Sequence, residues 1–225
     1  MRFYLITNDL LTYGVTALRG KVLAALLLVA PPVFAEQVSV LAFGDSLTQG
    51  YGLLDHQGLV PQLDQWLEDH GHNVRVVNAG VSGDTTAGGA ARIDWSLTPD
   101  IDAVMVTLGG NDMLRGIDPA VSRANLERIL TATQKADVEV LLVGMRAPGN
   151  YGVEYQATFD SIYPDLAQRF DTLYFENFFA GLGADDPAEL RDYFQPDGIH
   201  PNVKGVRRIV EALGPKVAQL VEATK

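Results

Sequence analysis

Three residues of this chain have the types and spacing that nucleophilic catalysis requires. Ser46 follows a short apolar run at 38–43 and lies within the sequence Gly44-Asp45-Ser46-Leu47. A serine hydroxyl becomes a nucleophile only when a base takes its proton. Of the 4 histidines, His200 lies in a turn rich in proline and glycine, three residues after Asp197. This spacing can bring the carboxylate to one ring nitrogen and leave the other to face Ser46, as a hydrolytic triad requires.

The same residues also have ordinary structural explanations, which the spacing alone does not remove. Asp45 and Ser46 are good helix-capping residues, so they could serve only to start the helix after the strand. Asp197 and His200 could serve only to shape the surface turn at 195–202. A catalytic interpretation therefore needs a further group that the reaction requires.

That further group is a set of hydrogen-bond donors for the oxyanion that forms in acyl transfer. Asn111 follows two glycines after a third apolar run, where backbone can approach a substrate closely. Gly80 ends another such run and can offer an unhindered backbone N–H. The backbone N–H of Ser46 is also a candidate, because the first amides of a helix lack intrahelical partners. Plain turn geometry explains the glycines equally well.

The pattern of the chain predicts the elements that position these residues. Strand-like apolar runs alternate with segments of helical periodicity. The expected strands are residues 38–43, 74–77, 103–108, 138–143 and 173–175, and the expected helices are 59–70, 85–97, 119–135, 155–170 and 203–222. Asp118 and Pro119 are typical of a helix start. Pro164 predicts a kink or a split in the helix 155–170, and the pair Gly214-Pro215 predicts a break in the helix 203–222.

This alternation predicts a parallel sheet with helices on both of its faces. In such folds the chemistry lies at the carboxyl ends of the strands. Three of the expected strands end in polar or glycine-rich corners, at 45–46, 78–80 and 109–112. These corners contain Ser46, Gly80 and Asn111, so the candidate residues fall where this class of fold places its sites.

Four segments resemble, in order and spacing, the sequence blocks of the SGNH hydrolases, also called the GDSL family. They are Gly44-Asp45-Ser46-Leu47, Gly80, Gly109-Gly110-Asn111-Asp112 and Asp197-Gly198-Ile199-His200. The wider segments 78–85, 108–116, 150–152, 162–164 and 196–202 resemble the bacterial arylesterase and thioesterase I–lysophospholipase branch. Gly-Asp-Ser-Leu alone would be a weak signal, whereas the ordered set is a strong one.

The resemblance implies a flavodoxin-like three-layer α/β/α sandwich with a central parallel sheet. It also implies an acyl hydrolase without metal or other cofactor. Its catalytic residues would be Ser46, Asp197 and His200, and its oxyanion donors would be Ser46, Gly80 and Asn111. The glycine-rich loop at 82–89 lines the acyl site in that branch. The residues that we expect to bind substrate are Asp45, Leu47, Ser82, Gly83, Asp84, Thr85, Met113 and Ile199.

Composition limits the partners. The chain has 225 residues, with 17 basic against 28 acidic side chains and a net charge of -11. Such an acidic surface argues against nucleic acid or an anionic membrane as the main partner. The absence of cysteine excludes thiol catalysis and disulfide bonds. The length suits one catalytic domain, and we expect a monomer.

The first 35 residues have the pattern of a secretory signal. Arg19 and Lys21 precede an apolar run at 22–30, and Val33-Phe34-Ala35 has the small residues typical of a signal-peptidase site. The run is too short to span a bilayer. The alternative to a cleaved signal is an N-terminal helix that tethers the protein to a membrane. We predict a signal peptide at 1–35 and a hydrolase domain at 36–225. The mature protein would be periplasmic or secreted, with no stable membrane span.

Three functions remain in comparison at this point. The leading hypothesis is a hydrolase of small acyl esters or thioesters, with lysophospholipids as further substrates. A deacetylase of polysaccharides or sugars is the alternative, since the same machinery removes acetate from sugars. A non-catalytic binding module is the third, and the intact set of Ser46, Asn111, Asp197 and His200 argues against it.

Overall fold

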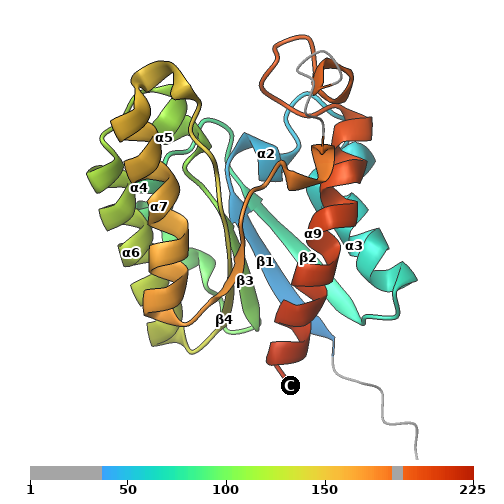
Figure 1. The fold of residues 1–225 in the computed structure, drawn as a ribbon. Helices are drawn as coiled ribbons and strands as arrows, with labels where there is room; N and C mark the ends of the chain where they lie inside the picture. Colours follow the sequence, from blue (N-terminus) through green and yellow to red (C-terminus); the bar gives the residue numbers. More distant parts are fainter. Residues whose placement is uncertain (1–36, 184–189) are drawn as a thin grey trace, which may run out of the picture. The chain divides into compact units, whose positions relative to one another are not determined.

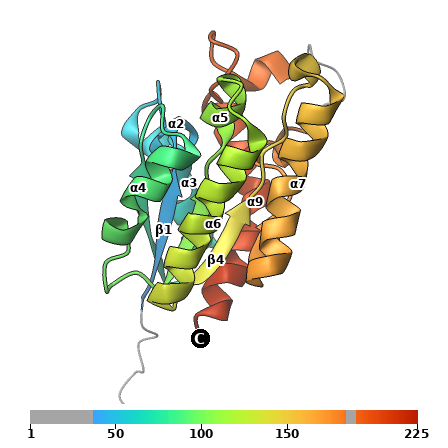
Figure 2. The ribbon, with the colours of Figure 1, turned by 90° about the vertical axis from the view of Figure 1, so that its left-hand side faces the viewer.

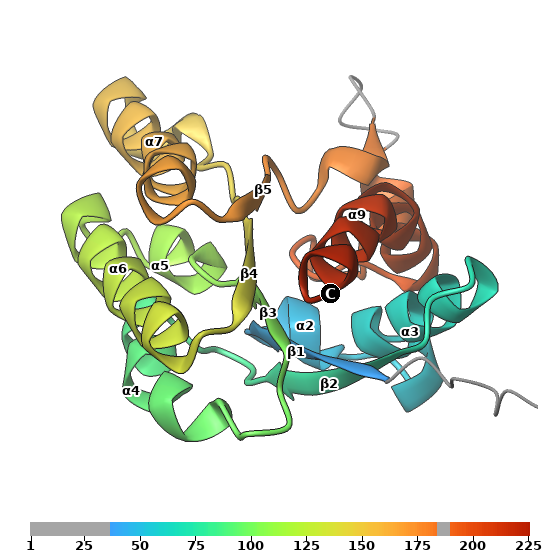
Figure 3. The ribbon, with the colours of Figure 1, turned by 90° about the horizontal axis from the view of Figure 1, so that it is seen from below.

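The computed structural model describes residues 37–183 and 190–225, and the predicted signal peptide at 1–35 lies outside them. A single parallel sheet has the strand order β2-β1-β3-β4-β5, seen end-on in Figure 3. Its strands are β1 (Val38–Gly44), β2 (Val74–Gly80), β3 (Ala103–Thr107), β4 (Glu139–Val143) and β5 (Leu173–Phe175). This order is the one found in flavodoxin-like doubly wound folds, as predicted.

Helices cover both faces of the sheet (Figure 1). One face carries α4 (Thr86–Ser96), α5 (Gly110–Leu114), α6 (Pro119–Ala136) and α7 (Val153–Phe170). Figure 2 looks onto α4, α6 and α7 on this face. The other face carries α3 (Leu59–Asp69) and α9 (Val203–Ala223), with the short α2 (Ser46–Gln49) directly after β1. The connections contain the 3-10 turns η1 (Asp55–Gln57), η2 (Gly149–Tyr151), η3 (Ala180–Leu182) and η4 (Arg191–Tyr193).

Burial of the strands follows from their position in the sheet. All residues of the central strand β3 are buried, because helices cover it on both sides. The edge strand β2 is only partly buried, with Arg75 exposed and Val76 buried. This strand continues to Gly80 and does not end at residue 77, because Asn78 still pairs with Ala42 and Gly80 with Gly44 of β1. This pairing places the end of β2 beside the end of β1.

Helix ends agree with the sequence pattern at α6, where the Asp118 carboxylate accepts a hydrogen bond from Ala120 N. The predicted break in α9 is wrong, since Pro215 lies inside this helix, and α7 is not split at Pro164. Each proline removes one backbone N–H, but the apolar stripes on these long helices are buried and keep them continuous.

Gly214 has a packing role in place of the predicted break. A Cβ atom at this position would lie 2.6 Å from the Trp66 ring, so the glycine lets α9 approach α3 closely. No helix in residues 37–183 and 190–225 is both long and apolar enough to cross a bilayer.

Candidate active site

Ser46 is the first residue of α2, immediately after the inner strand β1 and Asp45. The Asp45 carboxylate caps this helix by accepting a hydrogen bond from Leu47 N at 3.0 Å. Ser46 itself is only 9% exposed, so few directions of approach to its hydroxyl are open. The capping explanation is therefore correct for Asp45, and it leaves the Ser46 hydroxyl available for another partner.

That partner is the imidazole ring of His200. Its Nε2 atom lies 2.9 Å from Ser46 Oγ. Its Nδ1 atom lies 2.7 Å from Oδ2 of Asp197, and the other carboxylate oxygen accepts from the backbone N–H of Ile199 and of His200 itself. Because an ionised carboxylate can only accept, the proton of a neutral ring belongs on Nδ1, and Nε2 then accepts from the Ser46 hydroxyl.

These contacts also control the ionisation of Asp197. Partial burial would raise its pKa, but the hydrogen bonds from the His200 ring and from two backbone N–H groups outweigh it and lower the pKa to about 2. The side chain therefore remains a carboxylate at any pH near neutrality. A permanent negative charge beside the ring favours the imidazolium that forms when His200 takes a proton.

Gln195, which the sequence did not single out, connects the histidine turn to the loop after α2. Its side-chain amide donates to the backbone carbonyls of Tyr51 and Pro201, at 2.8 Å and 3.0 Å. Its backbone N–H donates to the carbonyl of His200 at 2.8 Å. These bonds tie the segment that carries the base to the segment that follows Ser46.

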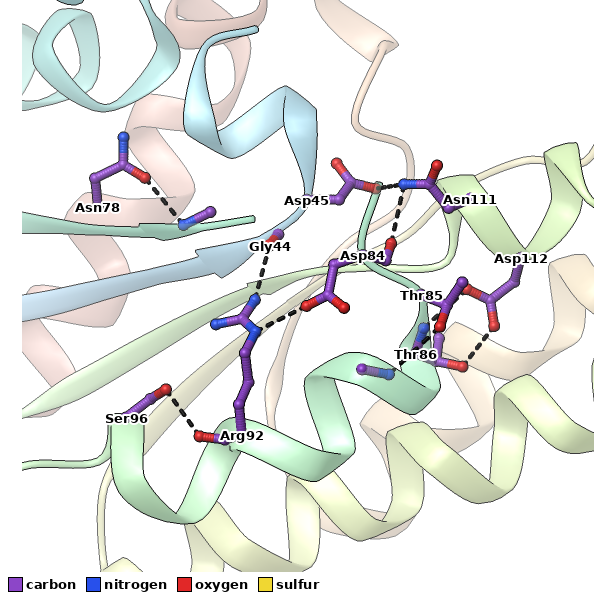
Figure 4. A network of polar contacts seen from close by, with 12 residues as sticks. Gly44, Asp45, Asn78, Asp84, Thr85, Thr86, Arg92, Ser96, Asn111 and Asp112 are labelled. Carbon is purple, nitrogen blue, oxygen red and sulfur yellow. Dashed lines mark hydrogen bonds and ion pairs between the residues drawn. The ribbon is translucent and has the colours of Figure 1, made fainter. Parts of the chain in front are cut away.

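The other two predicted oxyanion donors lie at the neighbouring strand ends. Gly80 is the last residue of β2, and its backbone N–H is 3.0 Å from the side-chain oxygen of Asn78. Asn111 lies in α5, and its Nδ2 donates to the backbone carbonyl of Asp84 at 2.9 Å and to Oδ2 of Asp45 at 3.2 Å (Figure 4). The Asn111 amide thus reaches the residue that precedes Ser46.

Asp45 is a buried carboxyl group next to this amide, with an exposed fraction of 1%. Burial raises its pKa to about 6, although the hydrogen bonds from Leu47 N and Asn111 oppose the rise. The pKa is raised at Asp45 and lowered at Asp197, so the two carboxyl groups of the site ionise at different pH values. Displaced pKa values of this kind gather at functional sites.

A cavity of about 340 Å³ opens beside Ser46, His200 and Asn111. Most of its wall is apolar and comes from the segments that follow β1, β3, β4 and β5 and from the histidine turn. The apolar lining residues are Leu47, Met113, Leu114, Met145, Phe179, Phe194 and Ile199. A cleft of this size with a few polar groups at one end suits a small apolar ligand that reacts at a polar head.

Comparison with known proteins decides the family. The profile of the GDSL-like lipase/acylhydrolase family matches residues 42–208, which include Ser46, Gly80, Asn111, Asp197 and His200. The chain belongs to this family. It is therefore a carboxylic ester hydrolase.

Relatives and solved structures support the same assignment. This GDSL hydrolase is 37% identical to the esterase TesA of Pseudomonas aeruginosa, covering 83% of this chain and 91% of that protein. It is 36% identical to thioesterase 1/protease 1/lysophospholipase L1 of Escherichia coli, covering 81% and 85%. The crystal structure of AlinE4, an esterase of the SGNH-hydrolase family, matches with 45% identity, a TM-score of 0.68 and coverage of 83% and 97%.

Four of the predicted substrate-binding residues line the cavity of this GDSL hydrolase, namely Asp45, Leu47, Met113 and Ile199. None of the residues 82–85 lines that cavity, although the Asp84 carbonyl contacts Asn111, which does. Ser82 Oγ donates to Gln49, the Gly83 carbonyl accepts from Arg115, the Asp84 carboxylate pairs with Arg92, and Thr85 caps α4.

Sequence reasoning missed two residues that line the cavity, Met145 and Phe194. The aromatic run Tyr174, Phe175, Phe178 and Phe179 is typical of either a groove wall or plain core, and its members take both places. Phe179 lines the cavity, whereas Phe178 is buried at 1% exposure. The signal that could have found Met145 is its position just after β4, at the same edge of the sheet as Ser46.

Proposed function

We propose that this GDSL hydrolase cleaves its ester through an acyl-enzyme on Ser46, with His200 as general base and Asp197 as the residue that orients the ring. The observation that carries the proposal is the pair of short contacts made by one imidazole, 2.9 Å to Ser46 Oγ and 2.7 Å to Asp197 Oδ2. This is the relation of nucleophile, base and orienting carboxylate that a serine hydrolase needs.

In the proposed reaction Ser46 Oγ attacks the carbonyl carbon of the ester as His200 Nε2 takes the hydroxyl proton. The tetrahedral intermediate collapses, and His200 gives that proton to the departing alcohol or thiol. Water then attacks the acyl-enzyme with His200 again as base, which releases the acid and restores Ser46. Asp197 stays ionised throughout, as its pKa of about 2 requires.

We assign the oxyanion to the backbone N–H groups of Ser46 and Gly80 and to the side-chain amide of Asn111. Gly80 N donates to Asn78, and Asn111 donates to Asp84 and Asp45. The developing oxygen would take over or share these donors. One such donor is typically worth about 3 kcal/mol in the transition state.

The proposed substrates are aryl and short-to-medium acyl esters, with thioesters and lysophospholipids as further substrates. The apolar wall of the cavity supports this choice, because each methylene that it buries contributes up to about 0.8 kcal/mol. The names of the relatives support it too, since an arylesterase of Vibrio mimicus is 34% identical over 82% of this chain and 92% of its own length.

A series of p-nitrophenyl esters from acetate to palmitate, run beside an acetylated sugar, tests the substrate class. We expect kcat/KM to climb with acyl length and then to level off where the cavity ends. If acetate is the best ester and the acetylated sugar is cleaved much faster than any aryl ester, the enzyme is a sugar deacetylase instead.

A Ser46→Ala variant tests the nucleophile in the same assay. We expect less than about a hundredth of the parent activity with an unchanged melting temperature, because only one oxygen atom is removed. An organophosphonate should label the parent covalently on Ser46 and leave the variant unlabelled. A solved relative, the psychrotrophic esterase EstA from Pseudoalteromonas, is described as inhibited by monoethylphosphonate; it is 26% identical, with a TM-score of 0.74 over 82% of this chain and 98% of its own.

Export to the periplasm or medium, with cleavage after Ala35, completes the proposal, and the mature enzyme would act as a monomer. N-terminal sequencing of the exported protein should begin near Glu36. An intact 1–35 segment on cytosolic enzyme would contradict export. Light scattering on the mature chain should give the mass of one protomer.

A further inference from the structure

We propose that Arg92, a buried arginine on α4, is a positioning residue that holds the Asn111 amide through Asp84. The proposal rests on the function proposed above, in which Asn111 donates to the oxyanion. Arg92 does not line the cavity beside Ser46 and is 8% exposed. Its effect on the reaction would therefore pass through the groups that it binds.

The Arg92 guanidinium joins two of the corners that surround the site (Figure 4). Its Nε atom donates to Asp84 Oδ2 at 2.7 Å, and its Nη2 atom donates to the backbone carbonyl of Gly44 at 2.8 Å. The side chains of Arg92 and Asp84 are 10% and 12% exposed. One side chain thus ties the loop after β2 to the last residue of β1, two positions before Ser46.

The surroundings leave this ion pair little freedom. The guanidinium carbon of Arg92 lies 3.8 Å from the centre of the Phe43 ring, an arrangement that favours a cation. On the other side, Gly88 leaves the space that the Asp84 carboxylate occupies, because a Cβ atom there would collide with Asp84 Oδ1. The pair therefore has one position, set by an aromatic ring and a glycine.

Asp84 transmits this position to Asn111 through its backbone. The Asp84 carbonyl accepts from Asn111 Nδ2 at 2.9 Å, which is shorter than the 3.2 Å contact of the same atom with Asp45. Fixing the side chain of Asp84 fixes its carbonyl, and the carbonyl fixes the plane of the Asn111 amide. A donor displaced by about 1 Å can cost up to about a hundredfold in rate.

The ion pair between Arg92 and Asp84 fixes the positions of these side chains but adds little to the stability of the fold. A buried ion pair gains little net free energy, because removing both charges from water offsets their attraction. A single substitution would leave one buried charge unpaired and would destabilise the fold. The informative variant therefore replaces both partners by apolar residues of similar size, as Arg92→Met with Asp84→Leu.

The test compares the kinetics of this double variant with those of a matched control. We expect kcat to fall by about ten- to a hundredfold while KM changes by less than about twofold, because binding of the acyl group is untouched. The control is Arg123→Met with Asp165→Leu, an ion pair between α6 and α7 at 2.8 Å that lies away from the cavity. It should leave kcat within about twofold of the parent.

The Asn111→Ala background separates positioning from general damage. Asn111→Ala alone should lower kcat by about a hundredfold or more, and the Arg92→Met/Asp84→Leu pair should then cost less than about twofold further. A full additional loss in that background would overturn the positioning role of Arg92. An unchanged kcat in Asn111→Ala alone would instead overturn the oxyanion assignment, and this result is obtained before Arg92 is altered.

A second variant keeps the test valid if the double variant does not fold. Gly88→Ala retains both charges but forces the Asp84 carboxylate to move. We expect it to lower kcat about tenfold or more in the parent and less than about twofold in the Asn111→Ala background. Parent-like kcat in folded Gly88→Ala would contradict the proposal.

Discussion

The rings of Tyr51 and His200 face each other, with their centres 4.6 Å apart and their planes tilted by 37°. Tyr51 comes from the loop after α2. The segment that follows Ser46 therefore packs against one side of the His200 ring. The ring packs on the imidazole that receives the Ser46 proton in the proposed mechanism. This contact limits how far His200 can turn away from Ser46.

Replacing Tyr51 by Ala should lower kcat/KM by about two- to tenfold. An aromatic pair of this kind contributes about 0.5–1.5 kcal/mol, and its loss lets the imidazole adopt other positions. Steady-state kinetics on one p-nitrophenyl ester measure the effect. Tyr51→Phe is the matched control and should retain parent activity; an equal loss in Tyr51→Phe would assign the effect to the hydroxyl group.

Asp197→Asn should lower kcat by about a thousand- to ten-thousandfold with little change in melting temperature. The asparagine oxygen can still accept from the backbone N–H groups of Ile199 and His200, so the turn should persist. Its amide group would donate where the carboxylate accepted, which favours the wrong tautomer of His200. Asp192→Asn in η4 is the control, and a loss in both variants would remove the special role of Asp197.

Asp45 should make folding stability depend on pH in a defined direction. Its pKa is about 6 in the folded chain and 3.8 in the reference state, because burial disfavours the charged form. The stabilising contribution of the protonated group is therefore complete below about pH 4 and is lost as pH rises through about 6. The loss is at most about 3 kcal/mol, from two pKa units at 1.36 kcal/mol each.

The Asp45→Asn variant cannot ionise at this position and lacks that dependence. The free energy of unfolding of this variant should increase relative to that of the parent as pH rises from about 4 to about 7. Urea unfolding at several pH values measures the difference between the two proteins. A difference that stays constant across this range would show that the carboxyl group ionises at the same pH in folded and unfolded chains.

Gly214→Ala should destabilise the fold by about 1–2 kcal/mol, although alanine favours helices over glycine. The added Cβ atom would lie 2.6 Å from the Trp66 ring, so α9 and α3 would have to separate. Thermal or urea unfolding measures the loss. In a Trp66→Leu background the loss should shrink, and a stabilised Gly214→Ala in the parent would mean that the ring moves aside freely.

The strands and the Asp197–His200 contact were predictable because local signals determine them. Buried parallel strands have continuous apolar runs, and the histidine turn is built from proline, glycine and Asx hydrogen bonds within a few residues. The continuity of α9 through Pro215 was not predictable in this way. Its apolar stripe is buried against the sheet and α3, and that packing outweighs the missing backbone hydrogen bond.

The cavity wall and the direction of Asp84 depend on packing between distant segments. Phe179 and Phe194 are apolar residues in irregular chain, and nothing near them in sequence indicates whether they face a cleft or the core. The Asp84 carboxylate turns towards Arg92, which lies on the next helix, and not towards the cavity. Its type and place in the loop suggested contact with substrate, but only the fold brings the arginine within reach.

Ser46 and His200 are 154 positions apart along the chain, and this separation affects the order in which activity returns during refolding. The five strands that form the sheet end at Phe175, before the turn that carries His200. A refolding chain can therefore complete its sheet, and give the corresponding circular dichroism, while it still lacks a base. Recovery of ester hydrolysis should lag behind that spectroscopic signal and report the docking of the C-terminal segment.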